Sequence, residues 1–155
     1  MTSSGYRGTR KTRSGRASEP NRIYHVTSTT LHREPVFASF GHGRTLVRAL
    51  RNQVDQRHVC SLAFVVMPDH FHWLLQLRGS RSLSVIVNAA KSESARRINA
   101  VRHLQHQLWQ KGFYDRAIRR EEDLEDVARY IVTNPLRAGL VKSLSQYPLW
   151  DAIWV

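Results

Sequence analysis

Two histidines, His70 and His72, are separated by a single residue, Phe71, directly after the turn-forming pair Pro68-Asp69. On a β-strand, side chains two positions apart point to the same face, so both imidazoles project together while Phe71 points into the core. Two adjacent imidazoles can chelate one divalent ion, although a complete site needs a third ligand. The alternative is a pair of exposed strand histidines, and this spacing alone leaves both interpretations open.

A second group of candidate residues lies near position 130. Apolar residues recur at helical spacing between Glu121 and Thr133, which predicts a helix that ends before Pro135. Tyr130 and Asn134 are one helical turn apart, beside the apolar face of that helix. A phenol and an amide oxygen at this rim could reach one site on the sheet. The alternative is a half-buried tyrosine followed by a helix-ending asparagine.

The elements that must position these residues are predicted from apolar periodicity and turn signals. The patterns predict strands at 23–30, 58–67 and 70–77, helices at 45–56, 82–99 and 121–133, and a loop at 109–115. This order favours an α+β fold of the ferredoxin-like split βαβ type, with a mainly antiparallel central sheet and helices packed on it. We expect Phe37 and Phe40 to pack beneath a turn at 33–35, and the aromatic segment 147–154 to dock on the domain.

Composition and charge limit the class of protein. The chain has 155 residues, with 24 Lys and Arg against 12 Asp and Glu, and this net charge of +12 favours a polyanionic partner such as nucleic acid. A single cysteine excludes a disulfide framework and a Cys-built zinc site. The longest apolar run, 62–67, is too short for a membrane helix, and the basic N-terminus lacks the apolar region of a secretory signal.

The basic charge divides into two parts. Residues 1–20 contain five basic residues and one acidic residue with almost nothing apolar, which predicts a disordered basic tail. Residues 21–155 retain a net charge of +8 and are expected to form a single domain, for which the resemblance described below implies a catalytic role. The candidate DNA contacts in this domain are Lys91, Arg96, Arg97, Trp109, Arg116, Arg119 and Arg120. For any one of these cations a solvated charge is the alternative, and for Trp109 it is packing under the loop.

Two longer stretches carry a family resemblance. Met67-Pro68-Asp69-His70-Phe71-His72 and Tyr130-Ile131-Val132-Thr133-Asn134-Pro135-Leu136-Arg137-Ala138-Gly139-Leu140-Val141 together resemble the REP-associated tyrosine transposases. These are HUH single-strand DNA nucleases with a single catalytic tyrosine, related to the small insertion-sequence transposases. The likeness runs from about Ile23 to Trp154 and includes Tyr24-His25-Val26, Trp109-Gln110 and Phe113-Tyr114-Asp115-Arg116.

The resemblance implies a role for each candidate residue. His70 and His72 would bind Mg²⁺ or Mn²⁺, with Asn134 as the third ligand where the insertion-sequence enzymes usually carry glutamine. Tyr130 would be the nucleophile of a metal-dependent single-stranded DNA endonuclease and strand transferase, forming a 5′-phosphotyrosine intermediate near REP-type hairpins. The resemblance also implies a cytoplasmic, nucleoid-associated bacterial protein with no membrane partner, as a monomer or alternatively a dimer.

Several alternatives stay open at this point. Tyr114 is a rival nucleophile, although it lies in an expected loop without an amide partner four residues on. His25 could face the metal from a neighbouring strand, and Asp69 could orient a histidine or only form the turn. Two other functions are a basic nucleic-acid-binding protein that has lost catalysis and a hydrolytic metalloenzyme that uses the His-x-His pair.

Overall fold

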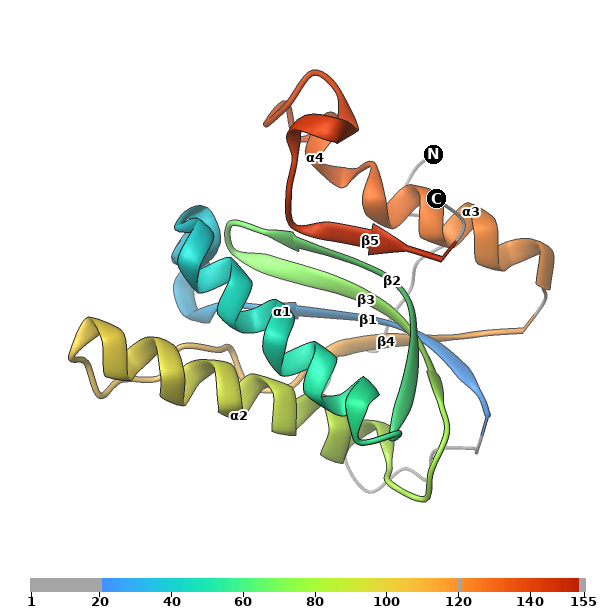
Figure 1. Cartoon of the computed structure of the whole chain (residues 1–155), viewed down its shortest axis with the longest axis horizontal. Helices are drawn as coiled ribbons and strands as arrows, with labels where there is room; N and C mark the ends of the chain where they lie inside the picture. The colour runs from blue at the N-terminus through green and yellow to red at the C-terminus, as the bar shows by residue number, and fades with distance from the viewer. Residues whose placement is uncertain (1–20, 120, 154–155) are drawn as a thin grey trace.

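The computed structural model describes residues 21–119 and 121–153 of the chain (Figure 1). The predicted tail, residues 1–20, and the candidate DNA contact Arg120 lie outside the described residues.

A five-stranded sheet forms the centre of the fold. Its strands are β1 (Ile23–Thr29), β2 (Val59–Met67), β3 (His70–Leu77), β4 (Tyr114–Ile118) and β5 (Trp150–Ala152). They lie in the order β4-β1-β3-β2-β5, and every neighbouring pair is antiparallel. The β2–β3 hairpin turns through Pro68-Asp69, as the sequence predicts, so the histidine pair begins the central strand β3.

Helices cover both faces of this sheet. The helices α1 (Phe40–Asp55) and α2 (Leu83–Arg102) lie together on one face, while α3 (Glu121–Val132) lies on the other and is followed by the short α4 (Asn134–Arg137) (Figure 1). Ser39 caps α1 and Ser82 caps α2, each accepting a hydrogen bond from a backbone N–H three residues on. The element order β1-α1-β2-β3-α2-β4 confirms the predicted ferredoxin-like α+β fold with an antiparallel sheet.

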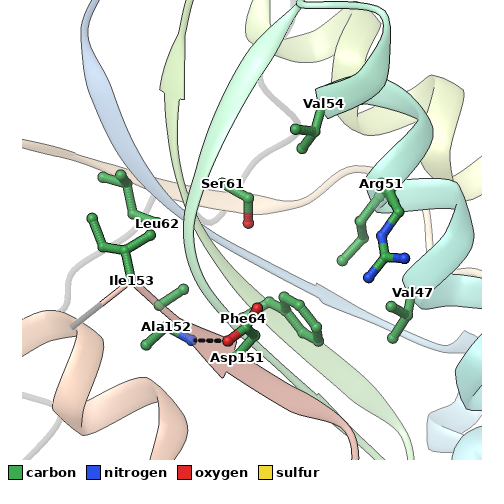
Figure 2. Close-up of a pocket in the computed structure, with 11 residues that line it drawn as sticks. Val47, Arg51, Val54, Ser61, Leu62, Phe64, Asp151, Ala152 and Ile153 are labelled. Carbon is green, nitrogen blue, oxygen red and sulfur yellow. Dashed lines mark hydrogen bonds between the residues drawn. The ribbon is translucent and has the colours of Figure 1, made fainter. Parts of the chain in front are cut away.

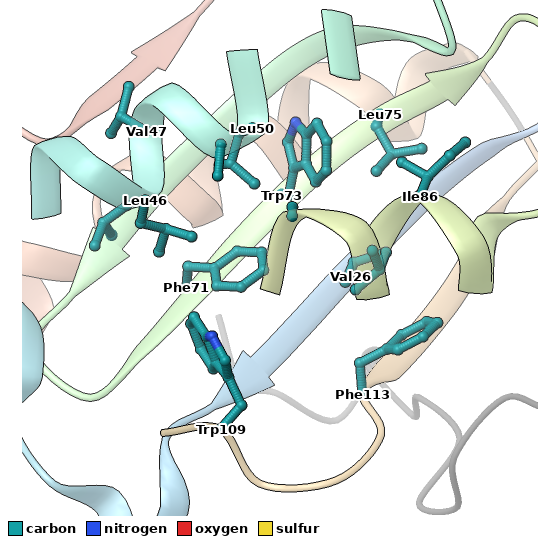
Figure 3. Close-up of a cluster of buried hydrophobic side chains, with 14 of the residues drawn as sticks. Val26, Leu46, Val47, Leu50, Phe71, Trp73, Leu75, Ile86, Trp109 and Phe113 are labelled. Carbon is teal, nitrogen blue, oxygen red and sulfur yellow. The ribbon is translucent and has the colours of Figure 1, made fainter. Parts of the chain in front are cut away.

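The larger core lies between the sheet and the α1–α2 layer (Figure 3). Phe71 and Trp73 of β3 are fully buried in it, so the alternate residues His70 and His72 face the α3 side. Trp109 packs against Phe37 in a tilted arrangement and against Phe71 edge to face, with ring centroids 5.4 Å apart in each pair. The second core joins α3 to β2, β3 and β5. The histidine pair therefore lies on the face that carries α3.

The structure corrects some element boundaries. Helix α1 begins at Phe40, five residues before the predicted start, and the predicted burial of Phe40 is wrong, because this ring is 56% exposed at the helix N-terminus. The expected loop at 109–115 already contains the first residues of strand β4. The aromatic C-terminal segment does dock on the domain, where it adds β5 to the edge of β2.

Candidate active site

A row of polar side chains crosses the α3 face of the sheet. In the antiparallel register, Thr27 of β1 lies opposite both His72 of β3 and Tyr114 of β4. Residues directly opposite each other in such a pair point to the same face, so these three side chains are neighbours. His25 and Arg116 form the next row on this face. The structure thus places five polar residues in two adjacent rows on the α3 face of the sheet, next to the start of the His-x-His pair.

His70 is fixed by the residue before it. Its Nδ1 lies 2.7 Å from Oδ1 of Asp69, and Oδ2 of the same carboxylate accepts a hydrogen bond of 3.0 Å from Nε of Arg33. Partial burial alone would raise the pKa of Asp69, but its contacts with His70 and Arg33 lower it overall. Burial lowers the pKa of His70. Asp69 is therefore an ionised acceptor that orients a neutral imidazole, in addition to forming the turn.

His72 is fixed from the neighbouring strand. Its Nδ1 lies 2.9 Å from Oγ1 of Thr27 and 3.1 Å from Nε2 of His25. Burial lowers the pKa of His72 well below its usual value, and electrostatic interactions with His25, His70 and Arg137 lower it further. Burial also lowers the pKa of His25 to about 3, with the charge of Arg116 acting in the same direction. Both rings are therefore neutral at physiological pH.

The ring nitrogens of His70 and His72 suit a divalent metal. The rings of His70 and His72 lie 5.1 Å apart between centroids, and each Nδ1 already has a partner. When each Nδ1 carries the proton, both Nε2 atoms keep a free lone pair, which is the form that metal binding requires. Among the described residues no cluster of three His, Cys, Asp or Glu side chains could hold a metal. Among the described residues, a third protein ligand would therefore be of another type, such as an amide.

His25 and Thr27 contact His72 at Nδ1, on the side of the ring away from the Nε2 atom that would bind a metal. His25 is 1% exposed and contacts the Nδ1 edge of His72, so the alternative in which it faces a metal does not fit its position. Sequence reasoning did not select Thr27 at all. Its alternation with His25 along the strand is visible in the sequence, but its pairing with His72 depends on the register of two strands that are 45 residues apart.

Tyr130 and Asn134 lie on either side of a break in the helix. Helix α3 ends at Val132, Thr133 has φ −86° and ψ 1°, and α4 begins at Asn134. Pro135 follows, so its ring and missing N–H prevent a continuous helix, as its position predicts. Both Tyr130 and Asn134 are half-buried, and no described residue is hydrogen-bonded to the side-chain amide of Asn134. The predicted helix is thus interrupted at Thr133, and Tyr130 and Asn134 lie on the two sides of one kinked segment.

The kinked segment is on the histidine side of the sheet. Ile131 and Val132, the residues after Tyr130, belong to the same buried cluster as Val65 and Met67 of β2, which lie opposite His72 and His70. The charge of Arg137, at the end of α4, contributes to the lowered pKa of His72. Within the described chain, no hydrogen bond or ring contact joins Tyr130 or Asn134 directly to the histidines.

The candidate DNA contacts fall into three groups. Arg116 lies on the histidine face beside His25, and its Nε is buried without a hydrogen-bond partner. Arg119 is exposed directly after β4. Arg96 and Arg97 are exposed on α2, on the opposite face of the sheet, where Arg97 forms an ion pair of 3.3 Å with Glu93. Of these candidates, Arg116 is therefore the one nearest the histidines, whereas Arg119 follows the end of β4 that pairs with Ile23, away from His70.

Two of the predicted DNA contacts are wrong, because they lie in the interior. Lys91 is 6% exposed, and its Nζ donates hydrogen bonds to the carbonyls of Gln110 (3.1 Å) and Gly112 (2.6 Å). Trp109 is also 6% exposed and donates from Nε1 to the carbonyl of Lys91. Both residues fix the loop before β4. Lys91 shares the inward stripe of Val87 and Ile98, and this spacing is a signal that sequence reasoning had available.

A pocket of about 180 Å³ lies away from these residues, between α1, β2 and β5 (Figure 2). Its lining is mainly aliphatic and aromatic, with Arg51 and Asp151 as its charged members. It contains no histidine, tyrosine or cysteine, so the candidate chemistry stays at the histidine face.

Comparison with known proteins establishes the family. Residues 18–134 match the family described as "Transposase IS200 like", and the chain belongs to that family. The match includes the His-x-His pair, both candidate tyrosines and Asn134. In this chain, the matched region contains strands β1 to β4 of the antiparallel sheet, the paired imidazoles of His70 and His72, and a tyrosine on the helix that covers the same face.

Two curated relatives confirm the predicted resemblance to the REP-associated tyrosine transposases. The chain is 30% identical over 87 residues to the REP-associated tyrosine transposase of Escherichia coli K12, covering 56% of this chain and 50% of that protein. It is 26% identical over 98 residues to a Haemophilus influenzae protein that bears the same name provisionally, covering 57% and 56% of the two chains. The chain thus matches about half the length of these curated relatives.

A solved structure shares the fold. The structure of a REP-associated tyrosine transposase bound to a REP hairpin matches with a TM-score of 0.73 and 23% identity, covering 90% of this chain and 82% of that one. At this identity the match supports the fold alone. None of the described helices has the length and apolar character needed to cross a membrane.

Proposed function

We propose that this protein is a metal-dependent single-stranded DNA endonuclease and strand transferase that acts beside REP-type hairpins, with Tyr130 as its nucleophile. The observation that carries this proposal is the pair His70 and His72, whose Nδ1 atoms are both engaged so that both Nε2 atoms can bind one metal. Family membership supports a DNA-processing reaction, and the net charge of +12 suits a nucleic-acid partner.

His70 and His72 would hold the ion, with the amide oxygen of Asn134 as the third protein ligand. When bound, Mg²⁺ or Mn²⁺ supplies Lewis-acid polarisation of the scissile phosphate and offsets the charge that develops there. The free side-chain amide of Asn134 and its place just after the helix break are compatible with this role. Arg116, on the same face of the sheet, would contact a phosphate oxygen of the bound strand.

In the covalent step, the phenol oxygen of Tyr130 attacks the phosphorus atom as the bond from phosphorus to the 3′-oxygen breaks. The phenol proton is lost, the departing 3′-oxygen takes up a proton, and the products are a 5′-phosphotyrosine and a free 3′-hydroxyl. The new linkage conserves the phosphodiester, so a 3′-hydroxyl of another strand can reverse the reaction without ATP.

The test is covalent capture of labelled single-stranded DNA that carries a REP-type hairpin, read on a denaturing gel with Mn²⁺. We expect an adduct with the wild-type protein that disappears with chelator and with His70→Ala. Tyr130→Phe should abolish the adduct and keep hairpin binding, whereas the matched variant Tyr114→Phe should retain adduct formation. Tyr114 is the right control because its side chain lies on the same face, beside Thr27.

Other outcomes would identify a different function. Hairpin binding without an adduct from the wild type would favour a binding protein of the same fold that has lost catalysis. Metal-dependent cleavage without an adduct would favour a hydrolytic metalloenzyme. Loss of the adduct in Tyr114→Phe, with retention in Tyr130→Phe, would reassign the nucleophile.

A further inference from the structure

Arg137 contacts the segment that carries Tyr130 in three ways. Its guanidinium carbon lies 3.9 Å from the centre of the Tyr130 ring. Its Nη2 donates a hydrogen bond of 2.6 Å to the carbonyl oxygen of the same residue, and its Nη1 donates one of 2.5 Å to Oγ1 of Thr133. The Thr133 hydroxyl in turn donates to the carbonyl of Arg129. One side chain from α4 thus holds both the backbone and the ring of Tyr130.

The break in the helix at Thr133 explains why the carbonyl oxygen of Tyr130 needs a side-chain hydrogen-bond donor. In a continuous α-helix, the carbonyl of Tyr130 would accept from the N–H of residue 134. No backbone N–H among the described residues donates to this carbonyl, because the chain turns into α4 at that point. Two side chains donate to it instead: Arg137 at 2.6 Å and the Thr133 hydroxyl at 3.3 Å. Arg137 also places a positive charge at the C-terminal end of α3, where the helix dipole favours it.

Capping alone does not require the stacked arrangement. A lysine ammonium could bond the same carbonyl, but it lacks the planar fork that bonds two acceptors while lying flat on an aromatic ring. The stack restricts the rotation of the Tyr130 side chain. Arg137 is also close enough to the histidine pair for its charge to influence His72. The guanidinium therefore contacts the candidate nucleophile directly and lies within electrostatic range of His72.

We propose that Arg137 is the positioning residue for the nucleophile: its stacked, doubly hydrogen-bonded guanidinium holds the Tyr130 ring in the orientation from which the phenol oxygen meets the scissile phosphate. This inference rests on the function proposed above. A nucleophile released from a fixed orientation loses about 100-fold in rate when the reacting atoms are no longer aligned. We expect hairpin affinity to change little, because the substitution alters the orientation of one ring.

The test compares Arg137→Lys and Arg137→Gln with a matched control, Arg129→Gln. Arg129 lies on the same helix one residue before Tyr130, is exposed, and pairs only loosely with Asp126 at 3.7 Å. For each protein we would measure hairpin affinity, the single-turnover rate of adduct formation at saturating DNA and Mn²⁺, and the thermal unfolding midpoint. All rates would be taken at a temperature where every variant is fully folded.

We expect both Arg137 variants to bind the hairpin within about threefold of wild type and to form the adduct about 100-fold more slowly. Arg129→Gln should match wild type. Lysine retains the charge and a carbonyl donor, so a slow Arg137→Lys variant with a near-normal unfolding midpoint would separate positioning from capping. Wild-type rates in both Arg137 variants would overturn the inference. A wild-type protein that forms no adduct would instead refute the proposed function, and this inference with it.

Discussion

The Thr27 hydroxyl oxygen lies 2.9 Å from Nδ1 of His72, directly across the β1–β3 pair. The same nitrogen lies 3.1 Å from Nε2 of His25, so His72 is held from behind by two side chains of one neighbouring strand. These contacts fix the plane of the imidazole and, when Nδ1 donates, select the tautomer with a free Nε2. The sheet register, rather than the His-x-His spacing alone, therefore determines how His72 is presented.

Replacing Thr27 by valine should weaken metal binding while preserving the strand. Valine is β-branched and of similar size, but it removes the oxygen that orients His72. We expect Mn²⁺ affinity to fall by about 10- to 100-fold, as measured by calorimetric titration. Thr45→Val, which removes a hydroxyl bonded only to the carbonyl of Gly41 in α1, is the control and should bind Mn²⁺ normally. Unchanged Mn²⁺ affinity in Thr27→Val would contradict the orienting role.

Asp69→Asn should test the equivalent support of His70. The amide retains an acceptor oxygen but loses the charge that strengthens the 2.7 Å contact with Nδ1 and the bond from Arg33. We expect about tenfold weaker Mn²⁺ binding and a slower adduct-forming step, with little change in unfolding free energy. Asp55→Asn, at the far end of α1, provides a charge-matched control. A turn role alone would leave Mn²⁺ affinity at the wild-type value.

The strands around the site were predictable because their signals are local. The predicted strand at 58–67, the Pro68-Asp69 turn and the alternation at 70–77 identify the central hairpin. The structure begins the first strand one residue later and reproduces the range 70–77 without change. Strand β4 was not predicted, because Tyr114–Ile118 places Asp115 and Arg116 in a short stretch with little apolar character. Its pairing with β1 supplies what its own composition lacks.

The site, too, has one part that local sequence predicts and another that depends on the fold. The pairing of His70 and His72 follows from the strand period of two, so sequence predicts it without knowledge of the fold. The support from Thr27 depends on register between distant strands, and the cap by Arg137 depends on how the chain turns after Thr133. Lys91 and Trp109 were misplaced for a related reason: a buried lysine is rare, and the carbonyls that accept its hydrogen bonds come from a loop about 20 residues away.

Trp109 should matter for stability rather than for DNA. Its ring packs on Phe37 and Phe71, and its Nε1 donates to the carbonyl of Lys91 at 3.1 Å and to Oγ of Ser94 at 3.2 Å. We expect Trp109→Ala to lower the free energy of unfolding by about 3–5 kcal/mol in urea titrations. Trp109→Phe, which keeps an aromatic ring, should cost less and leave hairpin affinity unchanged. Weaker hairpin binding in a fully stable Trp109→Phe would restore its predicted stacking on a base.

Lys91 should make the stability of the protein depend on pH in the alkaline range. Burial lowers the pKa of Lys91 from 10.5 to about 8. Between these two values the unfolded chain holds a proton that the folded protein has released, so the free energy of unfolding should rise with pH across this window. The full gain is about 3 kcal/mol, since each unit of pKa difference corresponds to about 1.4 kcal/mol.

Urea titrations at pH values from 7 to about 11 would measure this rise, with Lys91→Met and Lys111→Met as a matched pair of variants. Lys111 is exposed in the same loop, so its replacement should retain the wild-type pH slope. Lys91→Met should be less stable throughout, because the carbonyls of Gln110 and Gly112 lose their donor. It should also lack the Lys91 contribution to the slope. Equal slopes in wild type and Lys91→Met would show that burial does not disfavour the charged form of this lysine.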